Sequence, residues 1–300
     1  MTRYWPLLIL LASIWGGSYL FIKVAVEDIP PAAMTDIRLL VAGVLLFLYL
    51  SVSSGTVRGS LGELRAAWLP CLVLGLVNAA IPMTLVAWGE THIDSSIAAI
   101  AQSSVPIFVT LLSLRFLPNE PFGPSRVAGL VIGIGGVALV TGLHPEGGWW
   151  AVAGTLAVVL SSLSYAIGGI YGQLQVRGTP GPVLATGNML FGAALLVPLA
   201  LADPPTAAPG LDAVVALAGL ILLPTVLGQL ILFRMLRLHG SRRSSLVTYL
   251  MPGFALVYGS TILDEPVTAA GIGGLLLILA GVALASGQRL LGPRPQEARA

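Results

Sequence analysis

The chain has 300 residues, of which 56% are hydrophobic and only 9% are charged, and its mean hydropathy is +0.92. Soluble domains carry about 25% charged residues, so this chain cannot cover a water-facing surface. The composition also excludes a disordered protein, and a formal net charge of +2 leaves no basic surface for nucleic acid. The single cysteine, Cys71, excludes an intrachain disulfide. The chain is therefore expected to be an integral membrane protein.

Ten apolar stretches are each long enough to cross a bilayer as a helix, which takes roughly 20 residues. In chain order they cover about residues 5–26, 32–51, 66–89, 93–116, 124–142, 149–171, 180–201, 211–236, 243–262 and 266–288. They are apolar all round, whereas strands of a membrane barrel would alternate in polarity. The first stretch has no signal-peptide cleavage site, so we expect it to remain as a helix. The predicted fold is all-α, with ten transmembrane helices.

The basic residues predict the orientation of these helices. If both termini are cytoplasmic, 13 of the 15 Lys and Arg residues fall on inner segments, and the exceptions, Lys23 and Arg38, flank the outer end of the first hairpin. The outer segments are acidic and hold Glu27, Asp28, Glu90, Asp94, Glu146, Asp203, Asp264 and Glu265. We therefore expect both termini to be cytoplasmic.

The chain contains an internal repeat. Residues 120–142 and 265–287 share nine identities in 23 positions, without a gap, at a fixed offset of 145. The shared residues include the Glu-Pro pairs that open both segments and the glycines Gly129/Gly274 and Gly136/Gly281. Such self-similarity indicates that the chain was built from two copies of one unit.

The repeat divides the chain into three predicted parts. They are a first repeat of five helices over residues 1–142, a second over 149–288, and a cytoplasmic tail over 289–300. Because five is an odd number, the second repeat must enter the membrane from the opposite side. Inverted repeats of this kind are typical of transporters, although channels also contain them.

Several motifs of the chain resemble one known family. Trp15-Gly16-Gly17-Ser18 followed by Lys23, and Pro30-Pro31 followed by Arg38, resemble the first hairpin of the EamA family of the drug/metabolite transporter superfamily. The end of its repeat is matched twice, by Pro106, Glu120-Pro121, Gly129 and Gly136-Val137, and by Pro252, Glu265-Pro266, Gly274 and Gly281-Val282. The resemblance implies ten helices, cytoplasmic termini and metabolite transport, commonly export, in the bacterial inner membrane. Within the family, the chain is most similar to bacterial exporters of aromatic and other amino acids.

Polar and aromatic side chains at mid-span depth are the candidates for binding a substrate, because an unsatisfied polar group facing lipid costs several kcal/mol. The candidate cavity residues are Trp15, Tyr19, Asn78, Trp88, Gln102, Tyr165, Gln229 and Tyr249. The three amides among them could equally hold neighbouring helices together by hydrogen bonds.

Two sets of small or helix-breaking residues are expected to shape the bundle. Prolines interrupt four of the predicted helices and are candidate hinges, or else static kinks: Pro82, Pro106, Pro224 and Pro252. Glycines spaced by four and seven residues permit close helix approach, and we expect the fifth helix to pack against the tenth or the fourth through Gly129, Gly133, Gly136, Gly274 and Gly281.

The chain offers few fixed charges to a substrate. No carboxylate lies near mid-membrane, all three histidines fall in loops, and Lys23 and Arg38 are peripheral in the sequence. A pump usually carries a buried Asp, Glu or His relay, so we expect facilitated transport without a proton or sodium site. A small net-neutral substrate fits best, such as a zwitterionic amino acid. The deep aromatics would also suit an organic cation.

We therefore expect an exporter of small neutral metabolites, above all amino acids, aromatic and others with broad specificity, that alternates access around a central cavity. A drug or organic-cation exporter is the alternative. A channel would need a ring of charges or carbonyls, and an intramembrane enzyme would need a catalytic motif that the sequence lacks. We expect no enzymatic activity, no cofactor and no metal. The expected partners are the lipid bilayer and the small-molecule substrate, with no nucleic acid, and the protein is expected to be a monomer.

Overall fold

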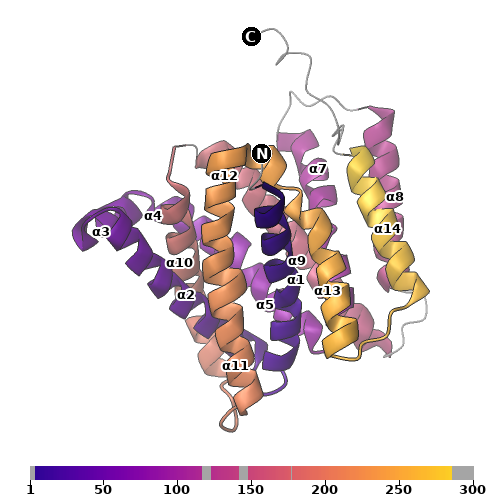
Figure 1. Cartoon of the computed structure of the whole chain (residues 1–300), viewed down its shortest axis with the longest axis horizontal. Coiled ribbons are helices and arrows are strands. Elements are labelled where there is room, and N and C mark those ends of the chain that lie inside the picture. Colours follow the sequence, from indigo (N-terminus) through magenta and orange to yellow (C-terminus); the bar gives the residue numbers. More distant parts are fainter. Residues whose placement is uncertain (1–3, 117–122, 142–147, 177, 286–300) are drawn as a thin grey trace.

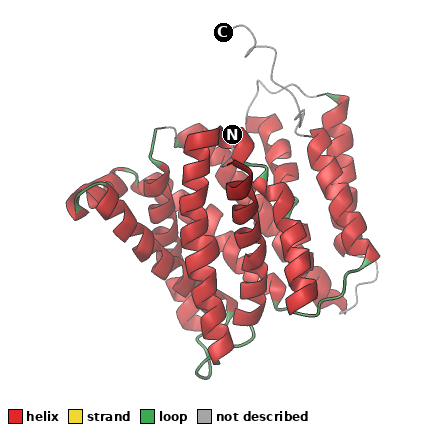
Figure 2. Ribbon diagram, in the orientation of Figure 1, coloured by secondary structure: helices red, strands yellow, loops and turns green. Residues whose placement is uncertain are grey.

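A computed structural model describes residues 4–116, 123–141, 148–176 and 178–285, without the side chains of 141, 241–243 and 285. Within these residues every regular element is a helix, and the long helices run roughly alongside one another in a single bundle (Figure 1, Figure 2). The first half contains α1 (Tyr4–Ala25), α2 (Pro31–Ser53), α3 (Val57–Ala66), α4 (Trp68–Leu74), the π-helix η1 (Gly75–Ala80), α5 (Ile81–Glu90), α6 (Ser95–Gln102), α7 (Val105–Phe116) and α8 (Pro124–Thr141). The second half contains α9 (Gly148–Gln175), α10 (Gly181–Ala202), α11 (Leu211–Leu220), the π-helix η2 (Ile221–Leu227), α12 (Gly228–Ser244), α13 (Val247–Ile262) and α14 (Ala269–Ala285).

Seven of the described helical segments are long and apolar enough to span a membrane: Tyr4–Ala25, Pro31–Ser53, Trp68–Glu90, Ser95–Phe116, Gly148–Gln175, Gly181–Ala202 and Leu211–Gly240. Three shorter apolar helices occupy Pro124–Val140, Val247–Ile262 and Ala269–Leu284. Large apolar side chains are exposed on the outer faces, for example Val131 at 65% and Leu276 at 62%, as expected where the solvent is lipid. The all-helical membrane class is thus confirmed, and the count of ten spans stays a prediction.

The two ends of the bundle differ in charge. α1 begins and α14 ends at the same end, which we call the terminal end, whereas α2 begins at the opposite or far end (Figure 1). The described arginines near the terminal end are Arg58, Arg65, Arg115, Arg126, Arg234 and Arg237. The acidic residues at the far end are Glu27, Asp28, Glu90, Asp94, Asp203, Asp212, Asp264 and Glu265. The charge asymmetry seen in the sequence is therefore retained between the two ends of the fold.

One helix was not expected from the apolar pattern. α3 carries charged residues and reaches sideways from the bundle near the terminal end (Figure 1). It begins after Thr56, whose hydroxyl accepts a hydrogen bond from the backbone N–H of Gly59 at 3.0 Å. This N-cap satisfies one of the free donors at the helix start.

Helices α8 and α14 pack closely side by side through glycines (Figure 1). A Cβ atom built on Gly136 would lie 2.8 Å from the carbonyl oxygen of Gly274, and one on Gly281 would lie 2.6 Å from that of Gly129. Gly129 and Gly136 are the sequence equivalents of Gly274 and Gly281. Gly136 thus meets Gly274, the counterpart of Gly129, and Gly129 meets Gly281, the counterpart of Gly136. Two inverted copies of one unit would make such a contact. Glu120-Pro121 of the repeat motif lies outside the described residues.

Two π-helical segments stand at corresponding places in the two halves. η1 begins at Gly75 and η2 at Ile221, 146 positions later, close to the offset of the sequence repeat. π-helices are rare and occur frequently at functional sites, because the wider turn leaves a backbone group free for another partner. Both segments contribute residues to the cavity described below.

Candidate functional site

A cavity of about 550 Å³ lies between the helices of both halves. Near the terminal end its wall includes Gly181, the first residue of α10, and Leu236 of α12. Toward the far end it stops at Ile22 of α1 and Val86 of α5. The cavity therefore extends from the terminal end into the bundle and stops short of the far end.

Six of the eight sequence-predicted cavity residues line this space: Trp15, Tyr19, Asn78, Gln102, Tyr165 and Gln229. The other two are placed elsewhere. Trp88 lies at the far end, with its ring centroid 4.5 Å from that of His92, which in turn stacks on Trp150 at 5.2 Å. Tyr249 packs against the apolar cluster between α8 and α14. Trp88 stands two residues before the end of α5 and Tyr249 two residues after the start of α13, so neither lies at the mid-span depth that the sequence analysis expected.

The predicted kink prolines coincide largely with helix interruptions. Pro82 is the second residue of α5, directly after η1, and Pro106 is the second residue of α7, after the break between α6 and α7. Pro224 lies inside η2, and Pro252 lies inside α13. Pro106 and Pro224 line the cavity. The hinge role of the four prolines stays a prediction.

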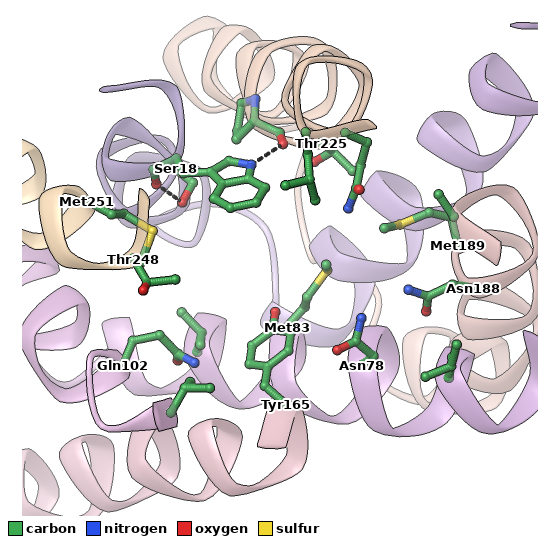
Figure 3. Close-up of a pocket in the computed structure, with 18 of the residues that line it drawn as sticks. Ser18, Asn78, Met83, Gln102, Tyr165, Asn188, Met189, Thr225, Thr248 and Met251 are labelled. Carbon is green, nitrogen blue, oxygen red and sulfur yellow. Dashed lines mark hydrogen bonds between the residues drawn. The ribbon is translucent and has the colours of Figure 1, made fainter. Parts of the chain in front are cut away.

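The segment η2 positions two cavity side chains. The indole N–H of Trp15 donates to the carbonyl oxygen of Pro224 at 3.0 Å (the dashed line to the left of the Thr225 label in Figure 3). The hydroxyl of Thr225 donates to the Leu220 carbonyl at 2.7 Å and accepts from Nε of Arg38 at 2.9 Å. The irregular backbone of one half thus fixes the orientation of Trp15 and Arg38 from the other half.

Arg38 is the principal correction to the sequence analysis. Its position near the end of α2 suggested a peripheral residue, but the side chain is only 8% exposed and lines the cavity. A long arginine side chain carries its charge far from its own backbone, so the sequence position is a poor guide to where the guanidinium lies. Only Nε has a hydrogen bond among the described residues, which leaves the two terminal nitrogens for another partner.

Two amides face the cavity from opposite halves. Asn78 lies on η1 and Asn188 on α10, and Figure 3 shows both side chains directed into the same space as Tyr165. Asn188 is 6% exposed, and its Oδ1 has no hydrogen-bond partner among the described residues. Sequence reasoning missed Asn188. A buried acceptor without a partner is costly, so this oxygen is suited to a donor brought by a ligand.

Gln102 closes the cavity on the side of α6 and α9. Its Oε1 accepts from the hydroxyl of Ser161 at 2.9 Å, and its backbone carbonyl accepts from that of Ser162 at 3.3 Å. Its amide oxygen therefore joins two helices, as the alternative interpretation of the amides expected. Met83, Met189 and Met251 add apolar, adaptable surface to the wall (Figure 3).

A set of contacts to backbone atoms, here called the far-end seal, closes the bundle beyond the cavity. The ammonium group of Lys23 donates to the carbonyl oxygens of Glu90 and Ile93, both at 2.8 Å. The carboxylate of Glu265 accepts from the backbone N–H groups of Ser95 and Ser96, at 2.7 and 3.0 Å. Lys23 thus binds the C-terminal end of α5, and Glu265 the N-terminal end of α6, as the helix dipoles favour.

Asp94 lies beside the seal and outside the spanning segments. Burial and then the negative charge of Glu265 raise its pKa above the ordinary value, while Lys23 acts in the opposite direction. Among the described residues, no group of three or more His, Cys, Asp or Glu side chains could hold a metal ion.

Comparisons with known proteins agree on one family. The model of the EamA-like transporter family matches residues 3–142 and again residues 152–287. The uncharacterized transporter YoaV of Bacillus subtilis is 28% identical over 274 residues, which cover 90% of this chain and 91% of the relative. An uncharacterized transporter of Archaeoglobus fulgidus is 26% identical and covers 93% and 97% of the two chains. The uncharacterized inner membrane transporter YedA of Escherichia coli K12 is 26% identical and covers 82% and 78%.

A solved crystal structure of another protein shares the fold. It superposes with a TM-score of 0.64 at 20% sequence identity, over 93% of this chain and 95% of that one. The likeness therefore extends over the whole bundle.

Proposed function

Because the chain belongs to the EamA-like transporter family, we propose that this membrane transporter carries α-amino acids, with the cavity as the binding site and Arg38 as the residue that binds their carboxylate. The observation that carries this proposal is the buried guanidinium with two nitrogens left for a ligand. Arginine binds carboxylates through paired, charge-assisted hydrogen bonds. A substrate without an anionic group would leave this cation unpaired in a site of low polarity.

The rest of the cavity is suited to the other parts of an amino acid. The unpartnered Oδ1 of Asn188 and the amide of Asn78 can accept hydrogen bonds from an ammonium group. Trp15, Tyr165 and the methionines offer apolar surface to a side chain. Methionine adapts to ligands of different shape, which supports a broad specificity that includes aromatic amino acids.

We further propose that the chain is a monomeric exporter of the bacterial inner membrane, built from two inverted five-span repeats with cytoplasmic termini. The exchanged glycine pairs of α8 and α14 and the equivalent positions of η1 and η2 support the repeats. The arginines at the terminal end support the orientation. The extension of the cavity toward the terminal end supports an inward-facing state of an alternating-access cycle.

Competition for transport tests the substrate class. Purified protein in liposomes preloaded with phenylalanine should accumulate labelled phenylalanine by counterflow, which a carrier shows and a channel does not. Phenylethylamine, which lacks the carboxylate, should compete at least tenfold less well than phenylalanine, because a charge-assisted hydrogen bond contributes about 1.5–3 kcal/mol. Equal competition by the amine would contradict the proposal and favour an organic-cation exporter.

The amide of Asn78 can be disturbed without changing the residue itself. A Cβ atom on Gly168 of α9 would lie 3.1 Å from Oδ1 of Asn78, whereas one on Gly169 would meet nothing within 4 Å. Gly168→Ala should therefore shift the Asn78 side chain and weaken phenylalanine binding several-fold, with Gly169→Ala as the matched control. Binding is measured by calorimetry on the purified proteins. Identical affinities in both variants would show that Asn78 does not contact the substrate.

A further inference from the structure

Glu90, the last residue of α5, is a carboxylic acid that the proposed binding site does not use. It is fully buried, and neither of its carboxyl oxygens has a hydrogen-bond partner among the described residues. Two other carboxylates at the far end have partners, since Glu265 accepts two backbone N–H groups and Asp28 accepts that of Gly210 at 2.7 Å. An ionised carboxylate removed from water without hydrogen bonds costs several kcal/mol. The arrangement around Glu90 is therefore suited to the neutral, protonated acid.

Charged groups approach Glu90 from several elements but do not neutralise it. Lys23 of α1 interacts with it electrostatically, yet the ammonium donates to backbone carbonyls and makes no ion pair with the carboxyl group among the described residues. Glu265, ahead of α14, adds a like charge, and Arg38 of α2, which lines the cavity, adds an opposite one. The remaining titratable groups around it are Tyr19 of α1, His92, and Asp94 before α6. α9, which packs against α5, carries no charged residue.

The position of Glu90 connects its protonation to the far-end seal. Its own carbonyl oxygen is one of the two that hold Lys23. Any movement that separates α1 from the turn between α5 and α6 breaks these bonds and admits water to the carboxyl group. In water the acid can ionise, and the freed ammonium of Lys23 can then face it.

We propose that Glu90 is a proton-binding site that holds a proton while the far end is sealed and releases it to the solution on that side when the seal opens. Alternation between these two states is part of the proposed transport function, but the proton site can be tested without a substrate. The sealed state binds the proton more tightly than the open state, so low pH favours the sealed state and high pH favours the open one. For one proton, the ratio of open to sealed protein rises by at most tenfold per pH unit.

Alkylation of an introduced cysteine measures this ratio. In a Cys71→Ala background, Ser96→Cys places a thiol within the far-end seal, where the side chain of Ser96 is 3% exposed and its backbone N–H is kept. Thr91→Cys places a thiol at an exposed position of the same end and serves as the reference for the pH dependence of thiol reactivity. Both proteins, purified in detergent, are treated with a maleimide between about pH 6 and pH 8. The rate at position 96, divided by the rate at position 91, should increase with pH.

The Glu90→Gln variant decides the test, because glutamine has the shape of glutamic acid and is neutral at every pH used. In this variant the rate ratio should be low and independent of pH, whereas Asp203→Asn, which changes an exposed carboxylate at the same end, should retain the full dependence. A pH-independent ratio with Glu90 present, or a pH-dependent ratio in Glu90→Gln, would overturn the proposal.

Infrared spectroscopy gives a second measurement, which does not depend on whether the far-end seal opens. Wild-type protein should show the carbonyl stretch of a protonated carboxyl group that Glu90→Gln removes, and an unchanged spectrum would also overturn the proposal. Neither measurement uses an amino acid. Failure of amino-acid transport would therefore leave the proton site standing, and failure of the proton site would leave the substrate proposal intact.

Discussion

Replacing Arg38 by glutamine is expected to weaken binding of phenylalanine by about a hundredfold or more. Glutamine retains a polar group but is shorter and carries no charge, so the substrate carboxylate would enter a buried site without a cation. Leaving one member of a buried ion pair unpaired costs about 3–5 kcal/mol, and each 1.4 kcal/mol is a factor of about ten in affinity. Calorimetric titration of the purified variant with phenylalanine measures the loss directly.

Two variants separate the charge of Arg38 from its positioning. Arg38→Lys keeps the charge but loses the paired geometry, and it should bind phenylalanine more weakly than the wild type and more tightly than Arg38→Gln. Thr225→Val removes the partner of Nε, so it should reduce affinity only several-fold. Wild-type affinity in Arg38→Gln would refute a carboxylate site at this residue.

Adding one methyl group to Gly136 is expected to destabilise the fold by about 1–3 kcal/mol, the usual cost of overpacking a close contact. Its Cβ would lie 2.8 Å from the backbone of α14, which cannot move aside as a flexible side chain can. Thermal unfolding of detergent-solubilised Gly136→Ala should show a lower Tm and a smaller yield of folded protein.

The neighbouring glycine supplies the control for this prediction. A Cβ atom on Gly135 would meet nothing within 4 Å, although the two residues are adjacent on α8. Gly135→Ala should therefore match the wild-type Tm or exceed it slightly, because alanine favours the helix by about 1 kcal/mol. Equal Tm values for the two variants would show that the α8–α14 contact does not limit stability.

The sequence predicts the class of fold because hydrophobicity and helix length are properties of single stretches of chain. Six of the eight cavity residues were also found in this way, since polar groups within an apolar helix must point away from lipid. Trp88 was placed at mid-span, yet it lies beside His92 at the far end. The mid-span depth of Trp88 was misjudged because the end of α5 was not located exactly, whereas the side that Tyr249 faces depends on the packing of the other helices.

Arg38 and Glu90 show a second limit of the sequence. Both stand near the ends of their predicted helices, where charged residues usually reach water. The fold instead buries both side chains, Arg38 beside η2 and Glu90 behind Lys23. The two π-helices were also not predicted, because an i to i+5 turn has no distinctive pattern of apolar residues. These features arise from contacts between segments far apart in the chain.

The far-end seal joins side chains to main-chain atoms rather than to other side chains. Lys23 binds carbonyl oxygens and Glu265 binds amide N–H groups, which every residue except proline can supply. The residues on the receiving side can therefore be exchanged without loss of closure, provided that the turn between the two helices keeps its shape. These contacts constrain the residue type at positions 23 and 265 alone. We therefore do not expect pairs of positions across this interface to covary during evolution.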